Sequence, residues 1–306
     1  MEYKKITVLI VTYKQADVIG RNIESILQQK EYGLHEIVIC DDCSPDNNWE
    51  VIQSYVEKYP GIIRAYRNNP NLGIYGNSNK LITLAGDADL FCWLEGDDAL
   101  CDGFFKKAQE AIVDQKIDVN DHICIQADYK AVTPEGKETV FDNSYLSRKK
   151  CSPLGAKLRV LTSWRATLFS KSILSLFKSA DVTKGLALAE NMFDNEWFVN
   201  MEKAYYIKCV GSIYFTNFGV SVNLSDNNCD YRTTEMMVNW QYWMSNDFLN
   251  KEDKRYAKSQ YMLAKLRVSH SLKDYLSYFF YYLLGNISYE FKLRSVFLNI
   301  RLCKRN

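Results

Sequence analysis

The sequence is 306 residues long, with 47% hydrophobic residues, 25% charged residues and a formal net charge of +1. A chain of this length can bury a sizeable core in one or two domains, and its composition excludes a disordered protein. The near-zero net charge gives no global field that would indicate nucleic-acid binding.

The first part of the chain alternates strands and helices. Short apolar, β-branched runs are typical of strands buried on both faces, and helical periodicity follows each of them. Such alternation predicts a parallel α/β sheet whose ligands lie at the carboxyl ends of the strands. The predicted strands are Ile6–Val11, Glu36–Cys40, Ile62–Tyr66 and Leu90–Leu94, and the predicted helices are Ala16–Gln28, Asn47–Tyr59, Ser78–Ala85 and Gly103–Val113.

The rest of the chain reads differently. A mixed pattern follows, with predicted strands at Ile123–Tyr129, Lys157–Leu161 and Ala204–Cys209, and the sequence becomes helical beyond Asp226. The first apolar segment is only about seven residues long, so we expect no signal peptide. No stretch approaches the roughly 20 apolar residues of a membrane-spanning helix. The nine scattered cysteines favour reduced thiols and a cytoplasmic protein.

Polar residues follow three of the predicted strands at the point where each strand ends. Thr12-Tyr13 follows the first strand, Asp41-Asp42 the second, and Glu95-Gly96-Asp97-Asp98 the fourth. Since parallel strands end at the same edge of a sheet, we expect these residues to converge on one crevice.

The acidic tetrapeptide from Glu95 to Asp98 carries three carboxylates within four residues. These groups repel one another unless a cation or solvent neutralises them. Hard divalent cations bind carboxylates together with substrate phosphates, and such a cation offsets the charge that develops on a diphosphate leaving group. The pattern therefore predicts a metal site; the alternative is a solvated acidic turn that caps the next helix.

The other two strand ends suit a nucleotide. Asp41 or Asp42 can accept a hydrogen bond from a base N–H or a ribose hydroxyl. The alternative is a helix cap, which Ser44 or Asp46 could supply alone, leaving Asp41 and Asp42 without a structural duty. Tyr13 can stack on a base, or it can belong to the core.

Four segments, taken in order, resemble the family 2 glycosyltransferases, in the subgroup that reads E-G-D-D. The resemblance is close over about the first 115 residues and looser to about residue 225. It implies an α/β GT-A fold, a Rossmann-like, mostly parallel sheet flanked by helices, with a C-terminal helical extension. The matching segments are Ile6 to Tyr13, Glu36 to Ser44, Asn71-Leu72-Gly73 with Asn79, and Leu94 to Asp98.

The resemblance also implies a domain division. Residues 1–225 would form the catalytic domain, in which 1–115 is the nucleotide-sugar-binding half and 116–225 the acceptor half. Residues 226–306 would form the helical extension.

Site residues follow from the same resemblance. Thr12, Tyr13 and Asp41 would hold the base, usually uracil, with Asp42 in support. The stretch from Asn71 through Gly73 to Asn79 would line the donor pocket.

The metal motif of the family, D-x-D, matches Glu95-Gly96-Asp97. Glu95 would face the ribose or a metal-bound water, Asp97 would bind Mn²⁺ or Mg²⁺, and Asp98 would support the metal site. Downstream, the segment from Tyr214 to Ser221 resembles one that lies near the donor phosphates, but Phe215 stands where the family usually has Arg.

An inverting transfer needs a carboxylate that takes the proton of the attacking hydroxyl. The family places it roughly 90–110 residues beyond the metal motif, before a helix, and this resemblance points to the stretch from Glu190 to Trp197. Asp194 is our choice because Trp197 begins the expected helix. Glu196 is the second candidate and Glu190 the third.

The C-terminal residues 272–306 combine aromatic and apolar residues at Tyr275–Leu284 with a basic segment beyond them. This combination is typical of a helix at the surface of an anionic membrane. The alternative is a helix pair packed on the catalytic domain, or a homodimer interface.

The sequence thus predicts an inverting glycosyltransferase that uses a nucleotide-diphosphate donor, a UDP-sugar by resemblance. A glycan or lipid-linked acceptor in cell-surface polysaccharide or lipopolysaccharide synthesis, at the inner face of the cytoplasmic membrane, completes the hypothesis. The main alternative is a non-catalytic nucleotide-binding or scaffold protein. A nucleotidyltransferase or a dinucleotide dehydrogenase would need a glycine-rich loop after the first strand, where Thr12-Tyr13-Lys14-Gln15 stands instead.

Overall fold

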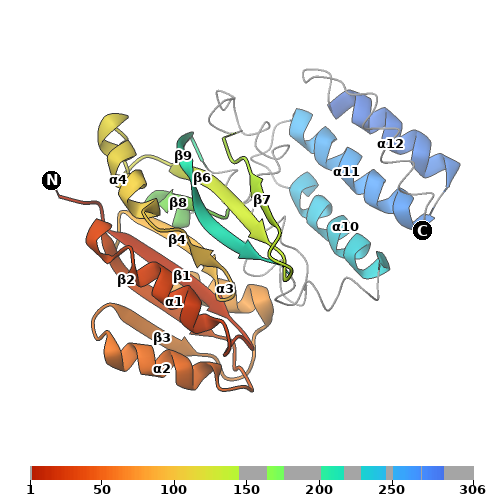
Figure 1. Ribbon diagram of the computed structural model, residues 1–306. Helices are drawn as coiled ribbons and strands as arrows, with labels where there is room; N and C mark the ends of the chain where they lie inside the picture. The colour runs from red at the N-terminus through yellow and green to blue at the C-terminus, as the bar shows by residue number, and fades with distance from the viewer. Residues whose placement is uncertain are drawn as a thin grey trace.

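A computed structural model describes residues 2–144, 164–175, 201–216, 229–245, 251–269 and 271–285. The strands within these ranges form one nine-stranded sheet, in which β7 pairs with β6 beside the main order β3-β2-β1-β4-β8-β6-β9-β5. Helices cover both faces of the sheet (Figure 1). The mostly parallel α/β fold predicted from the sequence is confirmed.

The N-terminal half of the sheet consists of β1 (Ile6–Thr12), β2 (Leu34–Asp41), β3 (Ile63–Arg67) and β4 (Leu90–Glu95), all of which pair in parallel. The register aligns their carboxyl ends, because Thr12 is opposite Asp41 and Val11 is opposite Glu95. These predicted strands are confirmed to within a few residues, and their end residues meet at one edge as expected.

The C-terminal half of the sheet is more mixed. It contains β5 (Ala99–Leu100), β6 (Ile123–Val132), β7 (Glu138–Phe141), β8 (Thr167–Ser170) and β9 (Lys203–Phe215). Strand β9 is parallel to β6 and antiparallel to β5, whereas β8 is antiparallel to β4 and β6. Because Ala99 is opposite Ile213, β9 brings its last residues beside the acidic loop. The predicted strand Lys157–Leu161 lies outside the described residues.

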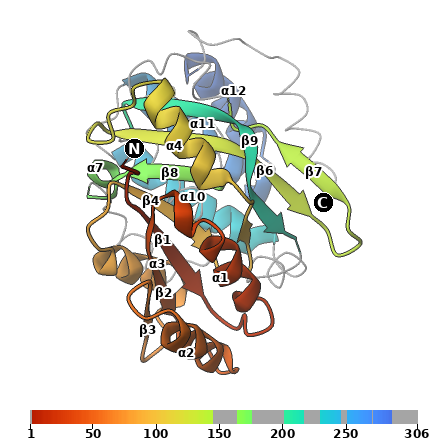
Figure 2. The same cartoon turned by 60° about the vertical axis from the view of Figure 1, so that its left-hand side comes forward.

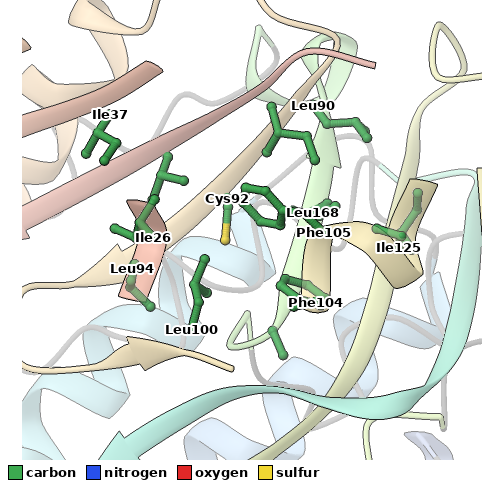
Figure 3. Packing of buried hydrophobic residues seen from close by; sticks show 14 of the residues in the cluster. Ile26, Ile37, Leu90, Cys92, Leu94, Leu100, Phe104, Phe105, Ile125 and Leu168 are labelled. Atoms are coloured by element: carbon green, nitrogen blue, oxygen red, sulfur yellow. The ribbon is translucent and has the colours of Figure 1, made fainter. Parts of the chain in front are cut away.

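Alternating side chains of β1 build two cores. Val8 and Ile10 pack with α1 (Ile19–Leu27), α2 (Asn48–Lys58) and α4 (Phe104–Asp114) on one face, while Leu9 and Val11 pack with α3 (Gly73–Leu84) and α7 (Lys171–Leu174) on the other. Figure 3 shows the first of these cores, where residues of β2, β4, β5, β6 and β8 meet α1 and α4. A single 3-10 turn, η1 (Lys30–Tyr32), leads into β2.

Helix α3 begins at Gly73, five residues before the predicted start near Ser78. Gly73 has φ +74°, a left-handed conformation that glycine adopts without strain, and it turns the polar loop into the helix. The first five residues of this helix include Gly73, Gly76 and Asn77, and they therefore have low helix propensity.

The C-terminal helices are α10 (Cys229–Ser245), α11 (Lys251–Ser269) and α12 (Leu272–Gly285). They lie side by side at the end of the molecule away from β3 and α2, with α12 outermost (Figures 1 and 2). Trp240 and Trp243 of α10 pack against α11, and Tyr278 of α12 packs against α11 from the other side. Each helix in the described ranges is too short or too polar to cross a bilayer.

Candidate functional site

The carboxylate of Asp41 at the end of β2 is fully buried and surrounded by donors of its own chain. Its Oδ1 accepts a hydrogen bond of 2.7 Å from Asn48 Nδ2, and its Oδ2 accepts one of 3.0 Å from the backbone N–H of Ser44. Arg67 Nε lies 3.4 Å from the same oxygen. Asn48 also donates to the Thr12 hydroxyl, so Asn48 connects the start of α2 to the ends of both β1 and β2.

Asp42 organises the loop that the resemblance assigned to the donor pocket. Its Oδ1 accepts hydrogen bonds of 2.8 Å from Asn68 Nδ2 and from the backbone N–H of Leu72. Asn71 Nδ2 donates in turn to the carbonyl of Asp42, and Asn71 Oδ1 accepts from the N–H of Gly73. The predicted residues Asp42, Asn71 and Gly73 therefore belong to one hydrogen-bonded unit.

These contacts correct one inference from the sequence. The N-cap of α2 is Asn47, and no side chain makes the capping hydrogen bond there. The idea that a cap by Ser44 or Asp46 would leave Asp41 and Asp42 without a structural duty is wrong, because both hold loops together. Tyr13 is half-buried, with Lys14 Nζ 5.1 Å from its ring centroid, so its ring is not part of the closed core.

The acidic loop is pinned between α1 and β1. Asn22 Nδ2 donates to the carbonyls of Glu95 and Asp98, at 2.7 and 3.0 Å. Gly96 donates its N–H to the carbonyl of Val11. A Cβ at Gly96 would lie 2.9 Å from the Cβ of Thr12, so only glycine permits this close approach.

Asp97 is 3% exposed, and its Oδ1 has no hydrogen-bond partner among the described residues. Burial raises the pKa of this carboxyl, against the opposing effects of nearby Arg165 and Arg21. A buried carboxylate oxygen without a donor is costly in isolation, and a cation would satisfy it.

Asp98 is 1% exposed and faces an arginine instead. Arg165 Nε donates to Asp98 Oδ2 at 3.3 Å, and the other end of the same guanidinium lies 3.6 Å from Glu95 Oε2. Burial raises the pKa of Asp98 to about 7, although Arg165 opposes the shift. The metal-ligand role predicted for Asp98 stays a prediction.

Aromatic side chains at the end of β9 hold two arginines against the acidic loop. The Cζ of Arg165 lies 4.1 Å from the ring centroid of Tyr214 and 4.7 Å from that of Trp164. The Cζ of Arg21 lies 3.6 Å from the ring of Phe215, and its NH2 donates to the carbonyl of Asp97 at 2.7 Å. Burial lowers the pKa of Arg21, and Asp97 and Asp98 oppose that effect.

The residues fit a divalent cation in part. In the described ranges no group of three or more His, Cys, Asp or Glu side chains is arranged as a complete metal site. The buried Asp97 Oδ1 without a donor nevertheless suits a metal that takes one protein carboxylate and completes its shell with water and substrate phosphates.

The structure thus brings the predicted strand-end residues together, and it adds residues that the sequence patterns did not indicate. Asn79 lies half-buried on α3. Asp194 and Glu196, as well as Glu190, lie outside the described residues. The residues that sequence reasoning missed share a polar contact to a predicted residue: Gln15, Arg21, Asn22, Asn48, Arg67 and Arg165.

The sequence profile of Glycosyl transferase family 2 matches residues 7–175, which is more than half of the chain. A protein of Mycoplasma genitalium named uncharacterized glycosyltransferase MG025 is 34% identical over 105 residues, covering 33% of this chain and 34% of that protein. The dTDP-rhamnosyl transferase RfbG of Shigella flexneri is 26% identical over 141 residues, covering 44% and 46%. The matches therefore span between a third and a half of these relatives.

Solved structures share the fold at low identity. TarS of S. aureus (residues 1-349), in complex with UDP-GlcNAc, superposes with a TM-score of 0.62 at 13% identity, covering 92% of this chain and 82% of that one. The mannosyltransferase PcManGT of Pyrobaculum calidifontis, in complex with GDP-Man and Mn²⁺, gives a TM-score of 0.55 at 11% identity, covering 99% and 81%.

Proposed function

This chain belongs to glycosyl transferase family 2, and on that premise we propose that it is a metal-dependent, inverting glycosyltransferase with a UDP-sugar as donor. The observation that carries the proposal is the buried carboxylate of Asp97, whose Oδ1 lacks a donor among the described residues. It lies in a loop that follows β4, beside the ends of β1 and β2. A parallel sheet binds its ligands at this edge.

Different side chains at this edge would bind different parts of the donor. Thr12, Tyr13 and Asp41 would form the base end, where the hydrogen bonds of Asn48 to Asp41 and Thr12 fix the ends of β1 and β2. Asp42 and Asn71 hold the loop that leads to Gly73 and Asn79. A pocket that is ordered before binding loses less entropy when the donor enters.

At the other end Asp97 would hold Mn²⁺ or Mg²⁺, and Glu95 would face the ribose or a metal-bound water, with Asp98 behind them. The bound cation would offset the charge that develops on the departing diphosphate. The buried surroundings of Asp97 and Asp98 would strengthen electrostatic interactions at the leaving group.

A thermal-shift experiment tests the donor site. We expect UDP to raise the melting temperature of the wild-type protein in the presence of Mn²⁺ and to have little effect in EDTA. Asp97→Ala should lose the metal-dependent shift, whereas Asp102→Ala, which changes an exposed aspartate close by in the sequence, should keep it. Absence of a shift with UDP, GDP and dTDP would favour the alternative of a non-catalytic scaffold.

Inversion requires one base on the acceptor side, and we propose Asp194 for that role with Glu196 as the second candidate. Asp194→Asn should abolish transfer and leave UDP binding within about twofold, because a base that acts on the acceptor does not hold the nucleotide. An active Asp194→Asn enzyme together with an inactive Glu196→Gln enzyme would move the base to Glu196.

For the acceptor we propose a glycan or lipid-linked sugar at the inner face of the cytoplasmic membrane, with residues 272–306 in contact with an anionic bilayer. Leu272, Leu276 and Phe280 recur every four residues on α12 and are 72%, 57% and 56% exposed. The sequence beyond Gly285 adds five basic residues against one acidic residue. An apolar helical stripe next to basic residues suits an anionic surface.

Co-sedimentation with vesicles tests this surface. Wild-type protein should bind vesicles that contain phosphatidylglycerol and not pure phosphatidylcholine. Replacing Leu272, Leu276 and Phe280 with serine should abolish binding, while serine at the exposed Val140 and Phe141 of β7 should not. A wild-type homodimer that ignores vesicles and dissociates in the triple variant would identify the stripe as a dimer interface instead.

A further inference from the structure

Arg165 contacts the side chains of the acidic loop. The guanidinium of Arg165 lies between two carboxylates of this loop and the aromatic ring of Tyr214. Arg165 lies two residues before β8, the strand that pairs with both β4 and β6. No sequence motif had indicated it.

The orientation of this guanidinium is fixed by three groups. Its Nε donates to the buried Asp98, and its plane lies near the rings of Tyr214 and Trp164. Its NH2 points to Glu95, which is 3.6 Å away. Stacking and the Asp98 contact hold the head group in place, so little side-chain entropy remains to be lost on ligand binding.

Of the two carboxylates that Arg165 contacts, Glu95 is the more accessible one. The side chains of Arg165 and Glu95 are 19% and 30% exposed, whereas that of Asp98 is 1% exposed. The separation of 3.6 Å to Glu95 makes this the looser of the two ion pairs, and an anionic ligand can compete for it. A guanidinium recognises phosphate oxygens with parallel hydrogen bonds.

We propose that Arg165 binds the diphosphate of the donor. It would keep Asp98 as its anchor and exchange its contact with Glu95 for phosphate oxygens. This inference rests on the proposed function, since it assigns a further binding residue to the same donor site. A cation on the leaving group also stabilises the charge that grows as the glycosidic bond breaks.

Arg21 does not fit the same role. It stacks on Phe215, and because side chains alternate along a strand, Tyr214 and Phe215 point to opposite sides of β9. Its NH2 already donates a hydrogen bond to the carbonyl of Asp97. Arg21 therefore shapes the loop from the other side, whereas Arg165 contacts Glu95.

Binding of UDP and of uridine separates a phosphate contact from a purely structural one. In Mn²⁺, Arg165→Met should raise the Kd of UDP by about 10- to 100-fold, the range expected for a charge-assisted hydrogen bond to phosphate, and leave the Kd of uridine within about twofold. Arg165→Lys should give a smaller loss. Equal losses for UDP and uridine, or an unchanged Kd for UDP, would overturn the proposal.

Arg64→Met is the matched control. Arg64 also pairs with a carboxylate, Glu36, and also lies over a tyrosine, Tyr66. It belongs to β3, the strand that begins the sheet order, and lies away from the acidic loop. Its replacement should change neither Kd. If the wild-type protein binds no nucleoside diphosphate at all, the proposed function fails. If the wild type and Arg165→Met bind UDP equally well, only the role of Arg165 fails.

Chemical modification gives a second answer on the unaltered protein, in case Arg165→Met does not fold. Phenylglyoxal labels accessible arginines, and peptide mass spectrometry reports each site. UDP with Mn²⁺ should protect Arg165 from labelling by at least about fivefold, uridine should not, and Arg64 should be labelled equally throughout. Equal labelling of Arg165 with UDP and with uridine would contradict the proposal.

Discussion

The pairs Asp41-Asp42 and Asp97-Asp98 lie on either side of β1, at the ends of β2 and β4, and all four residues are at most 3% exposed. What differs is the surroundings of their carboxylates. Backbone and side-chain donors reach Asp41 Oδ1, Asp41 Oδ2 and Asp42 Oδ1. In the second pair, Asp97 Oδ1 and Asp98 Oδ1 are buried without such a partner in the described part of the chain.

This difference teaches what each pair contributes. A buried carboxylate that accepts several hydrogen bonds stabilises the loops that supply them. A buried carboxylate oxygen without donors destabilises the folded state until a ligand arrives, which is typical of a functional site. The β2 pair therefore shapes the site, whereas in the β4 pair the Oδ1 atoms are the candidates for ligand contact.

The largest expected effect is that of Asp97→Asn on sugar transfer. This change should not lower stability, whereas a change in the β2 pair should. Asp97→Asn removes a buried charge, so the protein without metal should be at least as stable as the wild type in urea denaturation. The same change should lower sugar transfer by on the order of 1,000-fold, because the cation loses its carboxylate ligand. Asp102→Asn is the control for both measurements. A destabilised but active Asp97→Asn protein would break the comparison.

A change in the β2 pair should do the reverse. Asp42→Ala removes the acceptor of the Leu72 N–H and one of the two acceptors of Asn68 Nδ2, which should lower the free energy of unfolding by about 2–3 kcal/mol. Urea denaturation measures this loss. Asp118→Ala, which removes an exposed carboxylate bonded to Asn120, should change it by less than about 0.5 kcal/mol. Equal losses in the two variants would show that Asp42 has no special structural role.

The contrast also explains which parts of the molecule the sequence predicts. Buried strands such as Ile6–Thr12 can be predicted because they are continuous apolar runs, and a parallel sheet places their ends together. The convergence of Thr12, Asp41 and Glu95 followed from that rule alone. Local patterns were sufficient there because the information lies within a few residues.

The remaining parts depend on contacts between distant segments. Strand β5 has two residues and pairs with β9 more than 100 residues later, so no periodicity reveals it. Arg165 reaches Asp98 across 67 positions, and Arg21 reaches Asp97 across 76. Nothing in the neighbourhood of either arginine distinguishes it from an ordinary surface cation. The roles of Asp194 and Glu196 stay predictions.

The pH dependence of stability offers a sharper test of the β4 pair. Burial raises the pKa of Asp98 from 3.8 to about 7, so between these values the folded protein keeps a proton that the unfolded chain has released. The free energy of unfolding should therefore fall as pH rises through this window, by up to about 1.4 kcal/mol per pH unit, and level off above it. Urea denaturation in EDTA from pH 4.5 to 8 measures the slope. In Asp98→Asn the slope should be smaller; parallel curves would contradict the assignment.

The smallest expected effect concerns Gly96, which packs the acidic loop against the end of β1. Gly96 packs against Thr12 and Gln15. Gln15 accepts a hydrogen bond from the Thr12 hydroxyl, and it opposes the rise that burial causes in the pKa of Asp97. Gly96→Ala places a methyl group within 2.9 Å of the Thr12 Cβ. Because strand β1 cannot shift without disturbing both cores, the loop should move instead, lowering stability by about 1 kcal/mol.

The displaced loop should also weaken UDP binding several-fold in Mn²⁺ while uridine binding changes less, because the methyl group moves Asp97 more than it moves Asp41. Gly20→Ala on α1 is the matched control. Its nearest neighbour would be the Tyr55 hydroxyl at 3.3 Å, and the gain in helix propensity of up to about 1 kcal/mol should offset that contact. If Gly96→Ala weakened the binding of uridine and of UDP equally, the ends of β1 and β4 would move as one rigid unit. The assignment of separate roles to the two aspartate pairs would then be wrong.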